Sequence, residues 1–202
     1  MKKILFSALP VAAIALITLR PVSDPLPIGS SIPKAEIKMK DISGTEVSLN
    51  DAKKSNGLLV MFSCNTCPVV QGYQSRINEV CKYAKANNFG VILLNPNEAY
   101  RSKGDSYEDM KSYAGKEDFS WYYVVDKNSV MADAFGANRT PEVFLFDKNS
   151  KLAYHGAIDN NPGDAEGATR LHLKQAMKEL LSDQQVTQQE SKSVGCTIKR
   201  LS

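Results

Sequence analysis

The residues best suited to chemistry are two cysteines in the stretch FSCNTCPVV, residues 62–70. Two residues separate Cys64 from Cys67, and Pro68 follows directly. A cysteine attacks a disulfide or an oxidant as the thiolate, so the attacking residue should be the one whose setting lowers its pKa. The pair is therefore a candidate thiol–disulfide site.

Pro68 indicates which cysteine attacks. Proline is favoured at the first position of a helix, where its missing N–H removes no hydrogen bond. Cys67 is then the capping residue, with its sulfur directed at the free amides of residues 69 and 70, and these amides favour negative charge. Cys64 lies in the preceding loop and should keep a pKa near the ordinary value of about 8.5. We expect Cys67 to be the nucleophile.

Two further cysteines and two histidines are the other candidate ligands or reactive groups. Cys81 falls on the apolar face of a predicted helix and is interpreted as a core residue. Cys196 follows a polar segment, where packing explains it poorly, so it is a candidate resolving cysteine. His155 and His172 have no partners at metal-ligand spacing. A metal site therefore ranks below a redox site, and we expect no metal or other cofactor.

A second motif, Arg139-Thr140-Pro141, directly precedes the apolar stretch EVFLF. A proline that enters a strand is a candidate for a cis peptide bond in a tight turn, although an ordinary strand-entry proline is the alternative. We expect all three residues to line the redox site together with Pro68. A guanidinium near Cys67 would favour its thiolate.

The elements that position these residues alternate between strand and helix. In order along the chain they are a hairpin over 35–51, a strand at 58–62, a helix from 68 to about 87, a strand at 90–95, a helix near 106–116, a strand at 121–125, a short helix at 129–135, a hairpin over 142–158 and a long helix at about 166–182. The continuous apolar strands and the helical spacing between them predict an α/β fold. We expect a mixed sheet with helices on both faces and an N-terminal β extension.

The chain of 202 residues divides into four predicted segments. Residues 1–23 begin MKK and continue with an apolar run, which is typical of a bacterial secretory signal; an uncleaved N-terminal anchor is the alternative. Residues 24–34 are a predicted linker, 35–183 the folded domain and 184–202 a polar tail that carries Cys196. Export would place the cysteines where disulfides persist, so we expect a periplasmic or envelope-associated location.

The charge balance excludes some classes of partner. The segment 1–23 holds three of the 25 basic residues, so its removal leaves 22 against 22 acidic residues. A balanced chain without a basic cluster gives no electrostatic reason to bind nucleic acid or an anionic membrane surface.

Together these motifs resemble the thioredoxin-like superfamily, in its branch of redoxin, AhpC/TSA and peroxiredoxin-like proteins. The resemblance runs from IGSSIPKAEIKMKDISGTEVSLND through the cysteines and LNPNEAYRSKGDSYEDMKSYA to FGANRTPEVFLFD, and on to the ending VGCTIK. It implies a thioredoxin-like fold with a cis peptide bond at Pro141. Phe62 lies five residues before Cys67, which matches Cys67 to the attacking thioredoxin cysteine. Val70 replaces the second thioredoxin cysteine, and Met61 replaces the buried acid.

Three functions are compatible with this resemblance. The leading hypothesis is a thiol–disulfide oxidoreductase of the cell envelope, which acts on a protein or small-molecule disulfide or oxidant and depends on a thiol reductant. Cys67 would attack the substrate, and either Cys64 or Cys196 would resolve the intermediate. The second is a peroxiredoxin-like thiol peroxidase, although neither Cys64 nor Cys67 follows the Pro-x-x-x-Thr-x-x-Cys pattern of that group. The third is a non-catalytic metal-binding or interaction module on the same fold.

Overall fold

A computed structural model describes residues 24–201, so the predicted signal or anchor segment lies outside the described residues. Its centre is a mixed five-stranded sheet in the order β5-β4-β3-β7-β8. These strands are β3 (Gly57–Phe62), β4 (Phe89–Asn95), β5 (Tyr122–Val125), β7 (Glu142–Phe146) and β8 (Leu152–Gly156). β3, β4 and β5 are parallel, whereas β7 is antiparallel to both β3 and β8.

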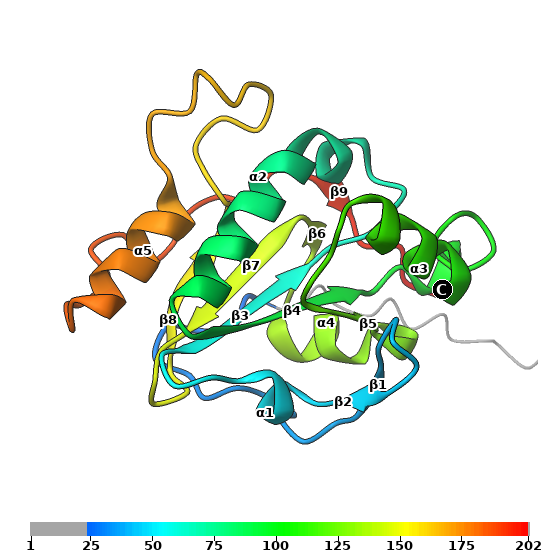
Figure 1. Cartoon of the computed structure of the whole chain (residues 1–202), viewed down its shortest axis with the longest axis horizontal. Coiled ribbons are helices and arrows are strands. Elements are labelled where there is room, and N and C mark those ends of the chain that lie inside the picture. The colour runs from blue at the N-terminus through cyan, green and yellow to red at the C-terminus, as the bar shows by residue number, and fades with distance from the viewer. Residues whose placement is uncertain (1–23, 202) are drawn as a thin grey trace, which may run out of the picture.

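Helices cover both faces of the sheet, as predicted (Figure 1). Residues of α2 (Pro68–Ala86), α3 (Tyr107–Lys116) and α5 (His172–Leu181) belong to one apolar cluster, and residues of α1 (Leu49–Ala52) and α4 (Val130–Phe135) to the other. β3 contributes to both clusters, with Leu59 and Met61 in the first and Leu58, Val60 and Phe62 in the second. This alternation follows from the two-residue period of a strand.

Short elements complete the fold. They are β1 (Met39–Lys40), β2 (Glu46–Val47), the 3-10 helices η1 (Glu98–Tyr100) and η2 (Lys127–Ser129), β6 (Arg139–Thr140) and β9 (Cys196–Thr197). β1 and β2 pair antiparallel and form the predicted N-terminal β extension. β6 pairs antiparallel with β9, which brings the C-terminal part of the chain to the residues before Pro141. In Figure 1 the red strand β9 lies beside β6 near the start of α2.

The last helix is shorter than predicted, because it begins at His172 and not near residue 166. The preceding residues form turns in which side chains bind backbone amides. Asn161 accepts from the amide of Asp164, and Asp164 accepts from the amides of Glu166 and Gly167. Asn and Asp side chains that satisfy nearby amides in this way compete with helix formation.

The segments predicted as linker and tail both lie against the sheet domain. The amide of Leu26 donates to Phe135 O at 2.9 Å, and the amide of Gly29 donates to Leu152 O at 2.8 Å. At the other end, residues 186–200, which we name the C-terminal strap, run from β8 across to η1. The amide of His155 donates to Gln189 O and that of Ala99 to Lys199 O, each at 2.9 Å. The division into segments itself stays a prediction.

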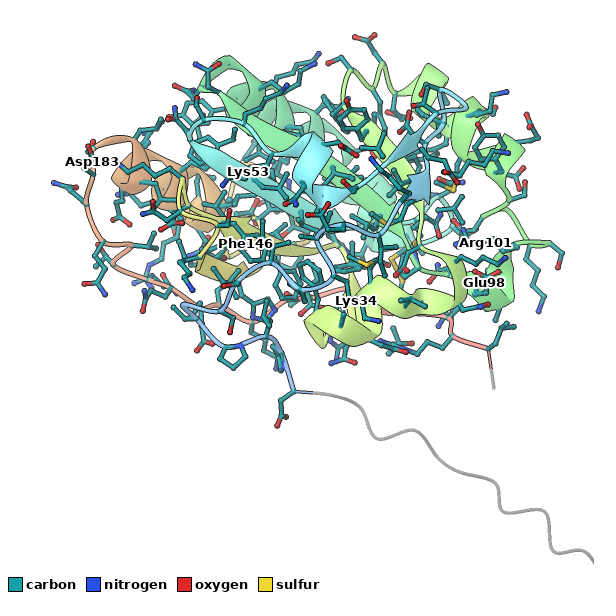
Figure 2. The ribbon with its side chains drawn as sticks, turned by 90° about the horizontal axis from the view of Figure 1, so that it is seen from below. Lys34, Lys53, Glu98, Arg101, Phe146 and Asp183 are labelled. Atoms are coloured by element: carbon teal, nitrogen blue, oxygen red, sulfur yellow. A yellow bond between two sulfur atoms is a disulfide. The ribbon has the colours of Figure 1, made fainter. Side chains whose placement is uncertain are left out.

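The length of the described helices and the positions of three labelled residues in Figure 2 complete the description of the fold. Within residues 24–201 no helix has both the length and the apolar character needed to span a membrane. Figure 2 shows Glu98 and Arg101 side by side, and their Nε–Oε2 distance is 3.6 Å. Asp183, at the opposite end of the molecule in that view, follows α5 and leads into the strap.

Candidate redox site

The two paired cysteines lie at the carboxyl end of β3, in the loop that leads into α2. β3 ends at Phe62 and α2 begins at Pro68, so Cys67 is the N-cap residue and Pro68 occupies the first helical turn, as predicted. Pro68 is exposed, whereas Cys67 is 2% exposed and Cys64 is 0% exposed. The sequence thus places one sulfur at the helix start and the other behind it.

Cys67 forms a disulfide with Cys196, with a Cα–Cα distance of 6.0 Å. The strap makes this contact possible, because β9 pairs with β6 in a register that sets Cys196 opposite Thr140. The expectation that the Cys67 sulfur points at the helix amides is wrong for this state, since the side chain makes no capping hydrogen bond. The sulfur is directed instead at its disulfide partner on the strap.

The Thr140-Pro141 peptide bond is cis, which confirms the prediction for Pro141. Thr140 is fully buried and contacts both cysteines of the loop. Its hydroxyl lies 3.2 Å from the Cys64 sulfur, in hydrogen-bond contact, and its carbonyl oxygen lies 3.4 Å from the Cys67 sulfur. Arg139 is exposed and its guanidinium donates to Gly195 O at 3.1 Å, next to Cys196.

Burial raises the pKa of the Cys64 thiol above its ordinary value. The Thr140 hydroxyl and the backbone amides of Cys67 and Thr66 oppose this effect, and the nearby Asp105 carboxylate adds to it. The expectation of an ordinary pKa for Cys64 is therefore wrong, because the loop is packed inside the fold and not open to water. Cys81 is buried as predicted for a core residue, and burial also raises the pKa of its thiol.

A buried carboxylate, Asp105, holds the loop between the two cysteines. Its oxygens accept from Asn65 N and Thr66 Oγ1 at 2.8 Å each, and from Asn95 Nδ2 at 2.8 Å and Asn97 Nδ2 at 3.1 Å. Asp105 is 0% exposed. Sequence reasoning missed this residue, because it lies in a polar loop forty residues from Asn65 and no local spacing links the two.

The same network reaches the strap through Asn97. Its side-chain oxygen accepts from the amide of Lys199 at 2.9 Å while its Nδ2 donates to Asp105. Arg200 then binds Asp133 and the Ala137 carbonyl at 2.8 Å and 2.7 Å. The strap is therefore fixed on the carboxyl side of Cys196 by side chains of the domain.

Close packing fixes the strap on the amino side of Cys196. A Cβ on Gly195 would lie 2.1 Å from Thr140 O, so only glycine permits the observed approach of the two backbones. Further back, Ser191 N donates to His155 O at 3.0 Å, and its hydroxyl lies 2.6 Å from that of Tyr154. Cys196 is thus held against the cysteine loop from both directions.

The two histidines have separate structural positions. His155 Nε2 binds Glu142 Oε1 at 2.8 Å, and the other oxygen of Glu142 accepts from the amides of Asn138 and Arg139. His172 begins α5. Among residues 24–201, no group of three or more His, Cys, Asp or Glu side chains is arranged to hold a metal ion.

Solved structures share this architecture. An uncharacterized conserved protein from Geobacillus kaustophilus is 28% identical with a TM-score of 0.80, over 87% of this chain and 93% of that one. A hypothetical protein from Sinorhizobium meliloti 1021 is 26% identical with a TM-score of 0.81, over 89% and 97%. The thioredoxin domain of a thiol-disulfide oxidoreductase from Bacteroides vulgatus is 22% identical with a TM-score of 0.53, over 64% and 88%, and shows the fold alone.

These likenesses establish the thioredoxin-like fold predicted from the sequence. A search of functionally curated proteins gives no match. The model of the AhpC/TSA family matches residues 28–155, which include the cysteine loop, Asp105 and the cis-proline turn. Since that match spans more than half of the sequence, the chain belongs to the AhpC/TSA family.

Proposed function

We propose that the protein is a thiol–disulfide oxidoreductase of the cell envelope, with Cys67 as the attacking thiol and Cys196 as the resolving thiol. The observation that carries the proposal is the disulfide between a helix-capping cysteine and a strap cysteine, beside the Thr140 carbonyl. Once this bond is reduced, the start of α2 offers Cys67 the partial positive charge that favours a thiolate.

The reaction needs two exchange steps. The Cys67 thiolate attacks one sulfur of a substrate disulfide, forms a mixed disulfide and releases the other substrate sulfur as a thiolate. The Cys196 thiolate then attacks the Cys67 sulfur, forms the Cys67–Cys196 disulfide and releases the second substrate thiolate. The substrate gains two electrons and the protein loses two. An external dithiol reductant returns the protein to its starting state.

The strap favours Cys196 as the resolving residue. Binding of residues 189–191 to His155 and of Lys199 to Asn97 and Ala99 keeps Cys196 close to Cys67 without requiring the disulfide. Holding a reacting group in place in this way replaces a bimolecular step with an intramolecular one. Resolution should therefore outcompete the attack of a second external thiol on the mixed disulfide.

Turnover of the single-cysteine variants tests the proposal. A dithiol reductant and a disulfide-linked polypeptide substrate are used, and the release of substrate thiols is followed. Cys67→Ser should abolish turnover, and Cys196→Ser should reduce it and accumulate mixed disulfide on Cys67. Cys81→Ala is the matched control, because Cys81 is a buried thiol within α2 that is far along the helix from its start. Full activity of Cys67→Ser would overturn the assignment.

The envelope location rests on the N-terminal sequence, in which the basic MKK precedes an apolar run, and on the presence of a disulfide, which persists in oxidising compartments. Fractionation of the native host, combined with mass analysis of the mature N-terminus, tests it. Protein confined to the cytosol with an intact N-terminus would contradict this part of the proposal.

A second candidate function is thiol peroxidase activity, which is favoured by the 2% exposure of Cys67 beneath the strap, because a small oxidant needs less access than a polypeptide. The Cys67 thiolate would cleave the O–O bond of a peroxide to give a sulfenic acid and an alcohol or water, and Cys196 would displace water to give the same disulfide. With one reductant and both oxidants, we expect disulfide reduction to be faster. A peroxide rate far above the disulfide rate would reverse the ranking.

A further inference from the structure

Cys64 is a third sulfur at the redox site, and the proposed pair of Cys67 and Cys196 does not use it. It is a free thiol with 0% exposure, so neither a polypeptide nor a reductant can reach it from outside in this conformation. Its hydrogen-bond contacts are with Thr140 and with the amides of its own loop. Any exchange reaction of Cys64 must therefore be with a sulfur inside the protein.

Cys64 and the Cys67–Cys196 disulfide both lie against Thr140. The Cys64 sulfur lies 3.2 Å from the hydroxyl of Thr140, and the Cys67 sulfur lies 3.4 Å from the carbonyl oxygen of the same residue. The two cysteines are also three positions apart in one loop, and the amide of Cys67 is a hydrogen-bond donor to the Cys64 sulfur. Cys196 is also next to Thr140, because the pairing of β9 with β6 sets the two residues opposite each other.

We propose that Cys64 is an internal exchange thiol that attacks the Cys67 sulfur of the Cys67–Cys196 disulfide and releases Cys196. The proposal rests on the proposed function, in which that disulfide is the product of turnover. The Cys64 thiolate supplies an electron pair to Cys67, the bond between Cys67 and Cys196 breaks, and its electron pair leaves on Cys196. The proton lost by Cys64 is balanced by one taken up at Cys196. No electrons enter or leave the protein.

This step converts one oxidised form into another with different accessibility. The product is a Cys64–Cys67 disulfide behind the start of α2 and a free thiol at Cys196, which is half-buried on the strap. The covalent tie between the strap and the domain is then absent, and noncovalent contacts alone hold the strap, among them the hydrogen bonds of β6 with β9, of His155 with residues 189 and 191, and of Asn97 with Lys199. The site would thus have a strap-tied and a strap-free oxidised form.

Alkylation and peptide mapping of the oxidised protein test the step. The protein is held without external thiol at about pH 9, above the ordinary cysteine pKa of about 8.5, with excess iodoacetamide. Trypsin leaves both loop cysteines in the peptide 55–76 and places Cys196 in the peptide 193–199. We expect the disulfide cross-link between the two peptides to disappear. The peptide 193–199 should then be alkylated at Cys196, and the peptide 55–76 should be lighter by two hydrogens, which indicates a Cys64–Cys67 disulfide. A cross-link that persists, or a peptide 55–76 that is alkylated at its cysteines, would overturn the proposal.

Variants distinguish internal exchange from other routes. Cys64→Ser should keep Cys196 protected, whereas Cys81→Ala should release it at the wild-type rate, independent of protein concentration. If Cys64→Ser does not fold, the lighter 55–76 peptide in the wild type still decides the question. Failure of the proposed function has a separate signature, because Cys67→Ser would then retain turnover. If Cys67→Ser loses turnover but Cys196 is released at the same rate in the wild type and in Cys64→Ser, the proposed function stands and the internal exchange is refuted.

Discussion

Two regions flank Cys67 and hold their sulfurs in different ways. On one side, Cys64 is enclosed in the loop between β3 and α2, where Asp105 binds the two residues between the cysteines. On the other, Cys196 lies half-buried on a strap that crosses the surface. Burial raises the pKa of the Cys64 thiol, so it is a slow nucleophile near neutral pH. It is also inaccessible to molecules outside the protein. The Cys196 sulfur, by contrast, is partly exposed and forms a disulfide with Cys67. In the proposed mechanism the enclosed Cys64 therefore reacts only within the protein, whereas the Cys67–Cys196 pair reacts with outside partners.

The largest effect on this comparison should come from Asp105→Ala, which removes the anchor of the enclosed side. Four donors in the interior lose their acceptor, so unfolding in urea should show a loss of about 3 kcal/mol or more. Glu166→Ala, which removes an exposed carboxylate, is the control and should change stability by less than about 0.5 kcal/mol. Equal stability of the two variants would show that the network does not hold the loop.

Gly195→Ala should loosen the strap and leave the enclosed side intact. The added Cβ would meet the Thr140 carbonyl, so the strap must move away, at a cost of about 1–3 kcal/mol in oxidised protein. The Cys67–Cys196 bond should also be reduced at lower concentrations of dithiol. Gly163→Ala serves as the control, because its nearest neighbour would be 4.0 Å away. If both variants are reduced at the same dithiol concentration as the wild type, the strap is not closely packed at Gly195.

The pH dependence of the reduced protein should report the enclosed thiol. Because the folded-state pKa of Cys64 lies above its value in the unfolded chain, the unfolded state loses its proton first as pH rises. Stability should therefore fall above about pH 8.5, and Cys64→Ser should flatten this fall. Cys81 contributes in the same direction, since burial also raises its pKa, so Cys81→Ala is the comparison variant. A slope unchanged by Cys64→Ser would place Cys64 in a more open setting.

The smallest effect should follow Arg139→Ala on the strap side. The guanidinium is exposed and donates to the Gly195 carbonyl, so its loss should lower the free energy of unfolding by no more than about 1 kcal/mol. The alkylation rate of Cys67 in the reduced protein should decrease only slightly. A decrease of tenfold or more would indicate that Arg139 stabilises the thiolate directly and would give it a larger role than the geometry supports.

Local signals predicted much of this arrangement. Continuous apolar runs marked β3 and β4, Pro68 marked the start of α2, and the proline before EVFLF marked the cis turn at Pro141. Each of these depends on neighbours in sequence. The pairing of Cys67 with Cys196 spans 129 residues and depends on the register of β6 with β9, for which the sequence offers no local indicator.

The burial of Cys64 likewise has no local signal in the sequence. Its pKa depends on burial beside Thr140 of β6 and Asp105 in the loop before α3, both of which are distant in sequence. The later start of α5 has a local cause, because the Asn161 and Asp164 side chains bind backbone amides in the turns that precede His172. Resemblance to a family supplied the fold, but it did not supply these contacts.

Trapping of substrate on single cysteines tests the central claim most directly. Reduced Cys196→Ser and Cys67→Ser proteins are each mixed with a disulfide-linked peptide, quenched with acid and mapped by mass spectrometry. The account predicts that Cys196→Ser, mixed near pH 7 and quenched before the slow Cys64 thiol can displace the peptide, carries one peptide bound to Cys67 within residues 55–76, and that Cys67→Ser carries none. A stable adduct on Cys64 or Cys196 in Cys67→Ser, with none on Cys67 in Cys196→Ser, would contradict it.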